Sequence, residues 1–497
     1  MAQHIGSDFT SFIGDLGRRL ETLFRGQPAN GSPGTVEDAL GEGALSVFIP
    51  ERFGGRGQHV DECLSMLETC SYESLPLSLV AGINGALFLQ PVSKYADEEV
   101  QARTFDRFVN HGALGGLMIT EPDFGTDALQ MRTSFRPEGD GYRLRGTKHW
   151  GGLTGRADHW LLTAREETEG GSLGRNINFF VWDRDLGGIE VDEYYDSLGL
   201  EMIPYGRNRI DTYLPGERRM TPLGSGVRML LDVLHRSRLQ FPGMGMGFLR
   251  RLLDEGMRHA RGRFVGGRPL ADYDQVQSRL AEIQAAYTTC SAMCAYTTGV
   301  AGVENDCSSQ ALPANTIKSV VTDIMQSAAQ SLLQLVGAAG YRRDHLAGSA
   351  VVDSRPFQIF EGSNDILYQQ ISEAVLKSMK RLKESNLARF LGVFEPTKRV
   401  AGRMPRDLDF SVEAGLPQRK MVDLGRILGR IMSMQMVLDM KDRGYREDLA
   451  ENCITMTIRE IRSLAGSFAH GDRAGAVEDY RDGSAWSAFL PDNHAEA

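Results

Sequence analysis

The distribution of apolar and polar residues divides the chain into zones of different texture. Residues 1–117 show helix-period stretches, interrupted by a turn rich in Gly and Pro at 49–57. Residues 118–222 contain short segments rich in β-branched and aromatic residues, such as HWLLTAR and NINFFVWD, separated by Gly, Asp and Pro. That texture predicts an antiparallel β-domain. Long helix-period segments return over residues 223–383, which predicts a helical domain after the sheet.

The last zone, residues 384–497, starts with a connection containing Pro and Arg and continues with two amphipathic stretches within 416–470. The apolar positions recur at helical spacing, as Met421, Leu424, Ile427, Leu428, Ile431 and Leu438 in the first stretch and Ile454, Ile458, Ile461 and Phe468 in the second. We therefore predict a helical hairpin that docks on the body of the chain or on a partner subunit. We expect it to serve assembly rather than the active site.

Composition narrows the classes of protein that fit. The 497 residues are 41% hydrophobic and 24% charged, which suits several folded domains. The net charge of −10 disfavours a protein that coats nucleic acid, and the lack of an apolar run of about 18 residues predicts no membrane-spanning helix. Six cysteines are too few for a disulfide framework and indicate the reducing cytoplasm. Cys290 and Cys294 are interpreted as packing residues, and no metal site is predicted.

Candidate chemistry is spread over five short motifs that follow one another along the chain. They are Ile119–Asp127 (ITEPDFGTD), Lys148–Gly152 (KHWGG), Arg263 with Gly266 and Gly267, Gln334–Tyr341 (QLVGAAGY), and Phe360–Asp365 (FEGSND). Together with IPERFGGRG at 49–57, this series resembles the acyl-CoA dehydrogenase family over residues 35–383. TEPDFGTD is similar to that family's T-E-P-x-x-G-S-D motif.

The resemblance implies a mainly α fold with an N-terminal helical domain (1–117), a central antiparallel β-domain (118–222) and a C-terminal four-helix domain (223–383). The hairpin extension (384–497) would follow these domains. It also implies FAD, bound between the β-domain and the helices, in a homodimer or homotetramer. Electron-transfer flavoprotein is the electron acceptor that the resemblance favours.

Individual site residues are implied by matching positions within the motifs. Flavin-facing positions are Ile119, Thr120, Trp150 and Gly152, while Thr126 matches a position near both the cofactor and the acyl thioester. Arg263 and Gln334 match the groups that reach the FAD of a neighbouring subunit, and Gly337, Ser363 and Asp365 match cofactor-binding positions. Arg238 and Gly362 match positions of the acyl-CoA site.

Glu361 is the candidate catalytic base, both by resemblance and by chemistry. Removing the α-proton of a thioester needs a carboxylate held close to that carbon and desolvated enough to raise its pKa. The apolar residues that would surround this carboxylate are Pro356, Phe357, Ile359 and Phe360. Some relatives carry the base before the matching Arg, but Ser237 stands there and cannot serve. A carboxylate that only favours the start of a helix is the structural alternative.

The function that the sequence predicts is FAD-dependent α,β-dehydrogenation of acyl-CoA to the 2-enoyl thioester. Glu361 would take the α-proton and flavin N5 the β-hydride. Three departures from the family pattern bear on it: Gly152 replaces a hydroxyl residue near the flavin, Val352 replaces an Arg, and His235 replaces an Asp near CoA.

Several alternatives remain open at this stage. An acyl-carrier-protein thioester, an acyl-CoA oxidase or a flavin monooxygenase would share the fold, although a monooxygenase leaves Glu361 without a role. A DNA-binding, damage-response relative is the alternative of another class. Residues 381–497 carry 18 basic and 18 acidic residues, which disfavours DNA binding, although the stretch 398–430 is locally basic.

Overall fold

The computed structural model describes residues 7–24, 36–41, 43–403, 406–412, 415–469 and 474–490. The N-terminal helices are α1 (Ser7–Phe24), α2 (Val36–Leu40), α3 (Val60–Glu73), α4 (Leu75–Asn84), α5 (Gln90–Tyr95) and α6 (Glu98–His111). Contrary to expectation, the stretch Leu75–Tyr95 is long and apolar enough to cross a membrane. Within its most apolar window 94% of the residues are buried inside the protein, which is the behaviour of a core helix.

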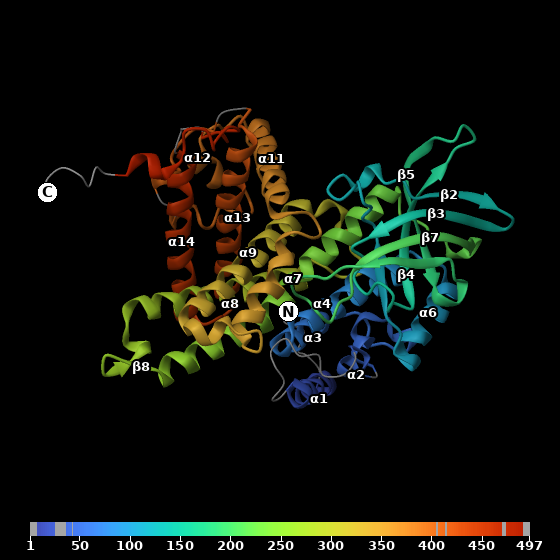
Figure 1. Cartoon of the computed structure of the whole chain (residues 1–497), viewed down its shortest axis with the longest axis horizontal. Coiled ribbons are helices and arrows are strands. Elements are labelled where there is room, and N and C mark those ends of the chain that lie inside the picture. The colour runs from blue at the N-terminus through green and yellow to red at the C-terminus, as the bar shows by residue number, and fades with distance from the viewer. Residues whose placement is uncertain are drawn as a thin grey trace.

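A seven-stranded sheet follows these helices (Figure 1). Its strands are β1 (Gly115–Met118), β2 (Ser134–Glu138), β3 (Gly141–His149), β4 (His159–Glu167), β5 (Leu173–Asp183), β6 (Ile189–Tyr194) and β7 (Gly206–Pro215). The order is β1-β4-β2-β3-β7-β6, and β5 pairs with β4. The sheet is mixed rather than purely antiparallel, because β1 and β2 both run parallel to β4. Periodicity reports the faces of a strand but not the direction of its neighbour.

The helical domain that carries most of the site consists of α7 (Gly226–Gly262), α8 (Asp274–Val300), α9 (Ala311–Val336), α10 (Leu346–Ser354) and α11 (Asn364–Leu382). Helix α7 is about 55 Å long at 1.5 Å per residue. It runs from the sheet to a tip formed by β8 (Phe264–Val265) and β9 (Arg268–Pro269) (Figure 1). A Cβ at Gly247 would lie 1.9 Å from the carbonyl oxygen of Glu68, so glycine lets α7 cross α3 closely.

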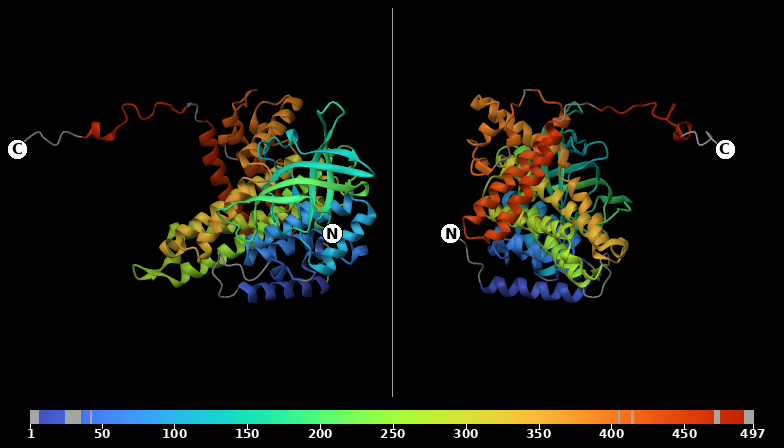
Figure 2. Two further views of the ribbon diagram at one scale, coloured as in Figure 1. Left: turned by 45° about the vertical axis from the view of Figure 1, so that its right-hand side comes forward. Right: turned by 90° about the vertical axis from the view of Figure 1, so that its left-hand side faces the viewer.

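The C-terminal extension contains α12 (Leu387–Leu391), α13 (Gln418–Lys441) and α14 (Glu447–Ala469). Helices α13 and α14 form the expected hairpin, which packs against α8, and α13 also packs against α9 and α11 (Figure 1). Leu424, Ile427 and Ile431 are buried in this contact. The extension therefore docks on the body of its own chain. After α14, residues 474–490 project away from the helices (Figure 2).

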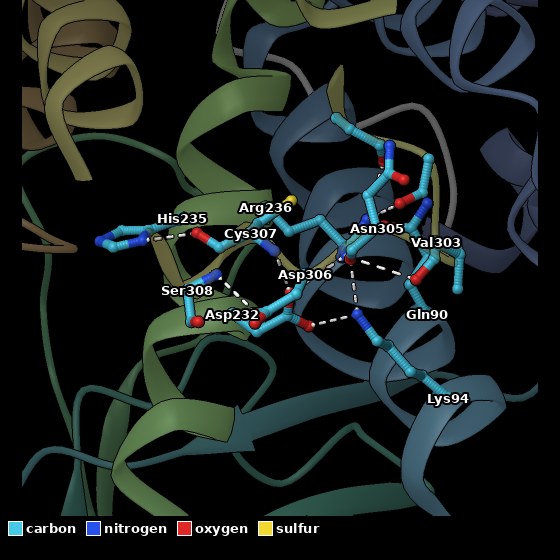
Figure 3. A network of polar contacts seen from close by, with 12 residues as sticks. Gln90, Lys94, Asp232, His235, Arg236, Val303, Asn305, Asp306, Cys307 and Ser308 are labelled. Carbon is cyan, nitrogen blue, oxygen red and sulfur yellow. Dashed lines mark hydrogen bonds and ion pairs between the residues drawn. The ribbon is translucent and has the colours of Figure 1, made fainter. Parts of the chain in front are cut away.

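A buried polar network ties the connection between α8 and α9 to α7 (Figure 3). The Asp232 carboxylate accepts hydrogen bonds from Lys94 Nζ at 3.1 Å, Arg236 Nη2 at 3.2 Å and the backbone N–H of Cys307 at 2.6 Å. His235 Nδ1 lies 2.8 Å from the carbonyl oxygen of Cys307. Burial lowers the pKa of His235 to about 4. This departure from the family pattern is thus a neutral imidazole that holds the chain's own loop.

Candidate functional site

The Glu361 turn lies between a short 3-10 helix (Arg355–Gln358) and the start of α11. Ser237 Oγ, from α7, donates a hydrogen bond of 2.8 Å to Oε1 of Glu361. The other oxygen, Oε2, is buried and accepts no hydrogen bond from the described residues. Burial raises the pKa of Glu361, and Ser237, Arg238 and Lys318 oppose that rise. One oxygen is thereby oriented while the other is free to accept a proton.

Two buried cations hold the backbone of this turn. Arg238 donates from Nε and Nη2 to the carbonyl oxygen of Glu361, at 3.0 and 2.7 Å, and from Nη1 to Oδ1 of Asn315 at 2.7 Å. Lys318 Nζ donates to the carbonyl oxygen of Gly362 at 2.8 Å. The structure thus shows Arg238 supporting the candidate base, whereas its contact with acyl-CoA stays a prediction.

The turn has an unusual backbone that requires this support. Glu361 has φ of 54° and Gly362 has φ of 90°, both in the left-handed region. A non-glycine residue there costs roughly 1–2 kcal/mol. A Cβ at position 362 would also lie 3.1 Å from Leu367 Cδ2 and 3.3 Å from Arg238 Nη2. Glycine at 362 is therefore demanded by the turn itself.

A buried ion pair fixes the motif at the sheet edge that carries the candidate flavin contacts. Lys148 Nζ lies 2.9 Å from Oε1 of Glu121 and donates to the carbonyl oxygen of Ile119 at 3.1 Å. The Glu121 carboxylate also accepts from the backbone N–H groups of Arg132 and Thr133, at 2.6 and 2.9 Å. Burial lowers the pKa of Lys148 to about 8. This pair anchors the half-buried segment of Ile119 and Thr120, while Thr126 lies exposed further along the loop.

Trp150 presents a broad aromatic surface at the end of β3. Its φ is 58°, its side chain lies 4.6 Å from the Tyr195 ring between centroids, and it is 53% exposed. The loop after Tyr195 is tied to α10, because the backbone N–H of Leu200 donates to Asp353 Oδ1 at 2.7 Å. A rigidly held, exposed indole at the junction of sheet and helices fits a planar cofactor ring that would cover it.

Gly152 makes room for a side chain of the N-terminal domain. A Cβ at this position would lie 2.8 Å from Cδ1 of Ile83 on α4 and 3.4 Å from Cγ2 of Ile203. The place where the resemblance implies a hydroxyl is therefore partly filled by Ile83.

Arg263, Gln334 and Gly337 do not join the Glu361 turn within one chain. Arg263 ends α7 roughly 38 Å along the helix from Arg238, at 1.5 Å per residue. Leu335 of α9 packs against Ala260 of α7, which brings Gln334 and Gly337 to the same end of the domain. There they line a cavity of about 450 Å³ together with Gln330, Leu333, Ala338 and Tyr341.

Ser363 and Asp365 begin α11 directly after the turn. Ser363 is half-buried at the N-cap, and Asp365 is exposed in the first turn of the helix. Asp365 Oδ1 pairs with Nη2 of Arg426, from the C-terminal extension, at 3.1 Å. The extension thus reaches one of the predicted FAD contacts.

Comparisons with known proteins agree with this arrangement. Three family models match the chain in order: the acyl-CoA dehydrogenase N-terminal domain over residues 28–111, the middle domain over 116–212 and the C-terminal domain over 224–376. The chain belongs to the acyl-CoA dehydrogenase family. It is an FAD-dependent oxidoreductase of that family, and the residues around Trp150 fit the cofactor.

The relatives are distant. An acyl-CoA dehydrogenase of Bacillus subtilis (strain 168) is 23% identical over 67% of this chain and 87% of its own length. The mitochondrial short-chain specific acyl-CoA dehydrogenase of Rattus norvegicus is 24% identical over 69% and 82%. The crystal structure of an acyl-CoA dehydrogenase complexed with FAD from Bacillus anthracis has a TM-score of 0.75 and 18% identity, covering 96% of this chain and 90% of that one. This last likeness includes most of the extension, and it concerns the fold.

Sequence reasoning missed the groups that hold the candidate base. The sequence indicates Ser237 only as a residue that cannot replace Glu361, and it assigns no role at the site to Lys318 or Asn364. One signal was present, since Lys318 stands in the otherwise uncharged helical segment ANTIKSVV. A lysine at such a position is expected to have a specific partner.

Proposed function

We propose that this protein oxidises an acyl-CoA thioester to the 2-enoyl thioester, with Glu361 as the base that removes the α-proton. The observation that carries the proposal is the buried Glu361 carboxylate, with Oε1 held by Ser237 and Oε2 without a partner among the described residues. A base poised in this way gains a proton without first losing a hydrogen bond at the accepting oxygen.

The residues around Glu361 supply position and a suitable pKa. Burial raises the pKa of the carboxyl group, which brings its basicity closer to that needed to remove a weakly acidic α-proton. Arg238 and Lys318 fix the turn so that the carboxylate approaches the substrate from one direction. Bound FAD supplies the acceptor for the β-hydride. Gly362 and Thr126 are assigned to the surroundings of the thioester.

The cofactor contacts divide between two chains in this proposal. Ile119, Thr120 and Trp150 would hold the flavin ring, and Ser363 and Asp365 would contact the cofactor from the start of α11. Arg263, Gln334 and Gly337 would act on the FAD of a second copy, because Arg263 lies roughly 38 Å along α7 from Arg238. Gln334 and Gly337 lie at the same end of the domain as Arg263, where Leu335 packs against Ala260. The assembly is therefore at least a dimer, and electron-transfer flavoprotein is its proposed electron acceptor.

Anaerobic titration of the FAD-loaded protein tests this function. A panel of acyl-CoA thioesters of graded chain length and branching, with matching acyl-carrier-protein thioesters, would be added while oxidised-flavin absorbance is followed. We expect at least one acyl-CoA to bleach the flavin and to yield a product two hydrogens lighter by mass spectrometry. Flavin that dithionite reduces but no thioester reduces would contradict the proposal. Rapid reoxidation by oxygen would instead favour an oxidase.

A further inference from the structure

A continuous line of buried and half-buried polar contacts connects the C-terminal extension to the Glu361 turn. We propose that Arg430, on α13 of the extension, is a positioning residue for that turn and acts through Asp323 and Asn364. The inference rests on the proposed role of Glu361 as the base. It makes the extension a functional support of the active site as well as an assembly element.

The inner half of the line starts at the turn. The Lys318 ammonium donates both to the carbonyl oxygen of Gly362, at 2.8 Å, and to Oδ1 of Asn364, at 2.9 Å. Asn364 Nδ2 in turn donates to Oδ1 of Asp323 at 2.6 Å. Asn364 is the first residue of α11 and lies three positions after Glu361. Its side chain therefore joins the turn to the α9 helix that bears Lys318 and Asp323.

The outer half runs from Asp323 into the extension. Asp323 Oδ2 accepts a hydrogen bond of 2.7 Å from the Tyr368 hydroxyl and lies 3.9 Å from Nη2 of Arg430. Arg430 Nη1 donates to the same hydroxyl at 3.4 Å, and its Nε donates to Oε1 of Glu460 at 2.8 Å. Tyr368 is fully buried and Arg430 is 7% exposed. Arg430 thus brings a positive charge to the outer end of the line, where Asp323 and Glu460 are acidic and Tyr368 is neutral.

The positive charge of Arg430 affects the Glu361 turn because it balances the negative charge of Asp323, to which Asn364 donates. Asp323 accepts hydrogen bonds from Asn364 and Tyr368, and Arg430 is the cation of the extension that faces it. Loss of a buried cation leaves the carboxylates that it faced uncompensated, so they move or take up a proton. Either response weakens or displaces the hydrogen bond from Asn364 Nδ2 to Asp323, which at 2.6 Å is shorter than those from the same amide to Thr322 and Ser319. A turn held in the left-handed region keeps its geometry only when its surroundings over-determine it.

The test compares Arg430→Met and Arg430→Lys with Arg459→Met in the full-length, FAD-loaded protein. Arg459 is the matched control because it lies on the same hairpin and lines the same 350 Å³ cavity as Arg430, but it donates a hydrogen bond to Ser278 instead of facing Asp323. The readouts are flavin per chain, the rate of anaerobic flavin reduction, the substrate concentration at half-maximal rate and the isotope effect of α-deuterated substrate.

For Arg430→Met we expect reduction roughly 10-fold slower, because a small displacement of a catalytic group costs much of its rate. Half-saturation and flavin content should remain within about 2-fold, and the α-deuterium isotope effect should rise as proton removal becomes more limiting. Arg430→Lys should recover part of the rate, and Arg459→Met should behave as wild type. A merely structural role would lower the active fraction and leave the isotope effect unchanged.

An unchanged rate and isotope effect in folded, FAD-loaded Arg430→Met would overturn the inference. Should that variant not fold, Asn364→Ala interrupts the same line closer to the turn, and wild-type kinetics there would overturn it equally. Glu361→Gln separates this inference from the proposed function. If Glu361→Gln abolishes flavin reduction while Arg430→Met does not alter it, only the coupling fails; if Glu361→Gln remains active, the base assignment itself fails.

Discussion

Helix α7 carries Arg238 in its first half and is followed directly by Arg263, and these two arginines have opposite surroundings. Arg238, in the middle of the molecule, is 8% exposed and donates three hydrogen bonds to the Glu361 turn and Asn315. Arg263, at the tip, is exposed, and within the described residues its side chain has no hydrogen bond or ion pair. The first arginine holds the turn of the candidate base with groups of its own chain. The second is an exposed cation, which the proposed function assigns to the FAD of a second copy.

Glu361→Gln is expected to have the largest effect. Glutamine keeps the size and the hydrogen bond from Ser237 but cannot take a proton, so flavin reduction by acyl-CoA should fall by at least ~10³-fold. Flavin content and thermal unfolding should stay close to wild type, because burial of the charged form is itself unfavourable. Stopped-flow reduction with a substrate found in the titration is the measurement. Near-normal rates would mean that another residue is the base. Arg238 would then support a turn without a catalytic role, and its contrast with Arg263 would lose its meaning.

Arg263→Ala should weaken FAD binding rather than slow the chemical step. Losing one charge-assisted hydrogen bond of about 1.5–3 kcal/mol predicts FAD affinity roughly 10- to 100-fold weaker, together with a smaller assembly. Arg258→Ala is the matched control, because Arg258 lies five residues earlier in the last turns of α7 and, among the described residues, has its ion pair with the nearby Glu255. Flavin absorbance per chain and light-scattering mass provide the readouts. Full occupancy in an unchanged oligomer would show that the tip does not reach a second cofactor.

The sequence was sufficient for the parts of the molecule that depend on local pattern. Periodicity predicted the helical zones and the hairpin of α13 and α14, and the motif series led to the family. It could not predict that β1 and β2 run parallel to β4, since alternation in a strand carries no information about its partner. The support of the turn was also out of reach, because Lys318 and Asn364 are 46 residues apart and meet only in the folded chain.

The pH dependence of Ser237→Ala tests whether the Ser237 hydroxyl tunes the pKa of Glu361. The Ser237 hydroxyl stabilises ionised Glu361 and so opposes the rise in pKa that burial causes. Without it the pKa of Glu361 rises further, and the acid limb of kcat/KM moves to higher pH, with little change in rate above that limb. Ser237→Thr retains a hydroxyl and should keep the wild-type limb. A limb at the same pH in both variants would mean that this hydrogen bond does not tune the base.

Gly152 yields the smallest expected effect and concerns the edge of the flavin-facing surface. The family resemblance implies a hydroxyl facing the flavin at this position, and one neutral hydrogen bond contributes about 0.5–1.5 kcal/mol. Here a Cβ would lie 2.8 Å from Cδ1 of Ile83, so Gly152→Thr alone should disturb the contact between α4 and the sheet and lower FAD content modestly. Removing that methyl group with Ile83→Val should restore FAD content in the double variant. The restored hydroxyl would then shift the flavin spectrum or speed the reduction of the flavin by a few-fold.

If Gly152→Thr binds FAD normally without the second change, the Ile83 side chain moves aside at little cost, and lack of space does not explain the glycine at position 152. If the double variant also leaves the spectrum and rate unchanged, position 152 does not touch the flavin, and the assignment of the Trp150 surface to the cofactor ring would have to be revised.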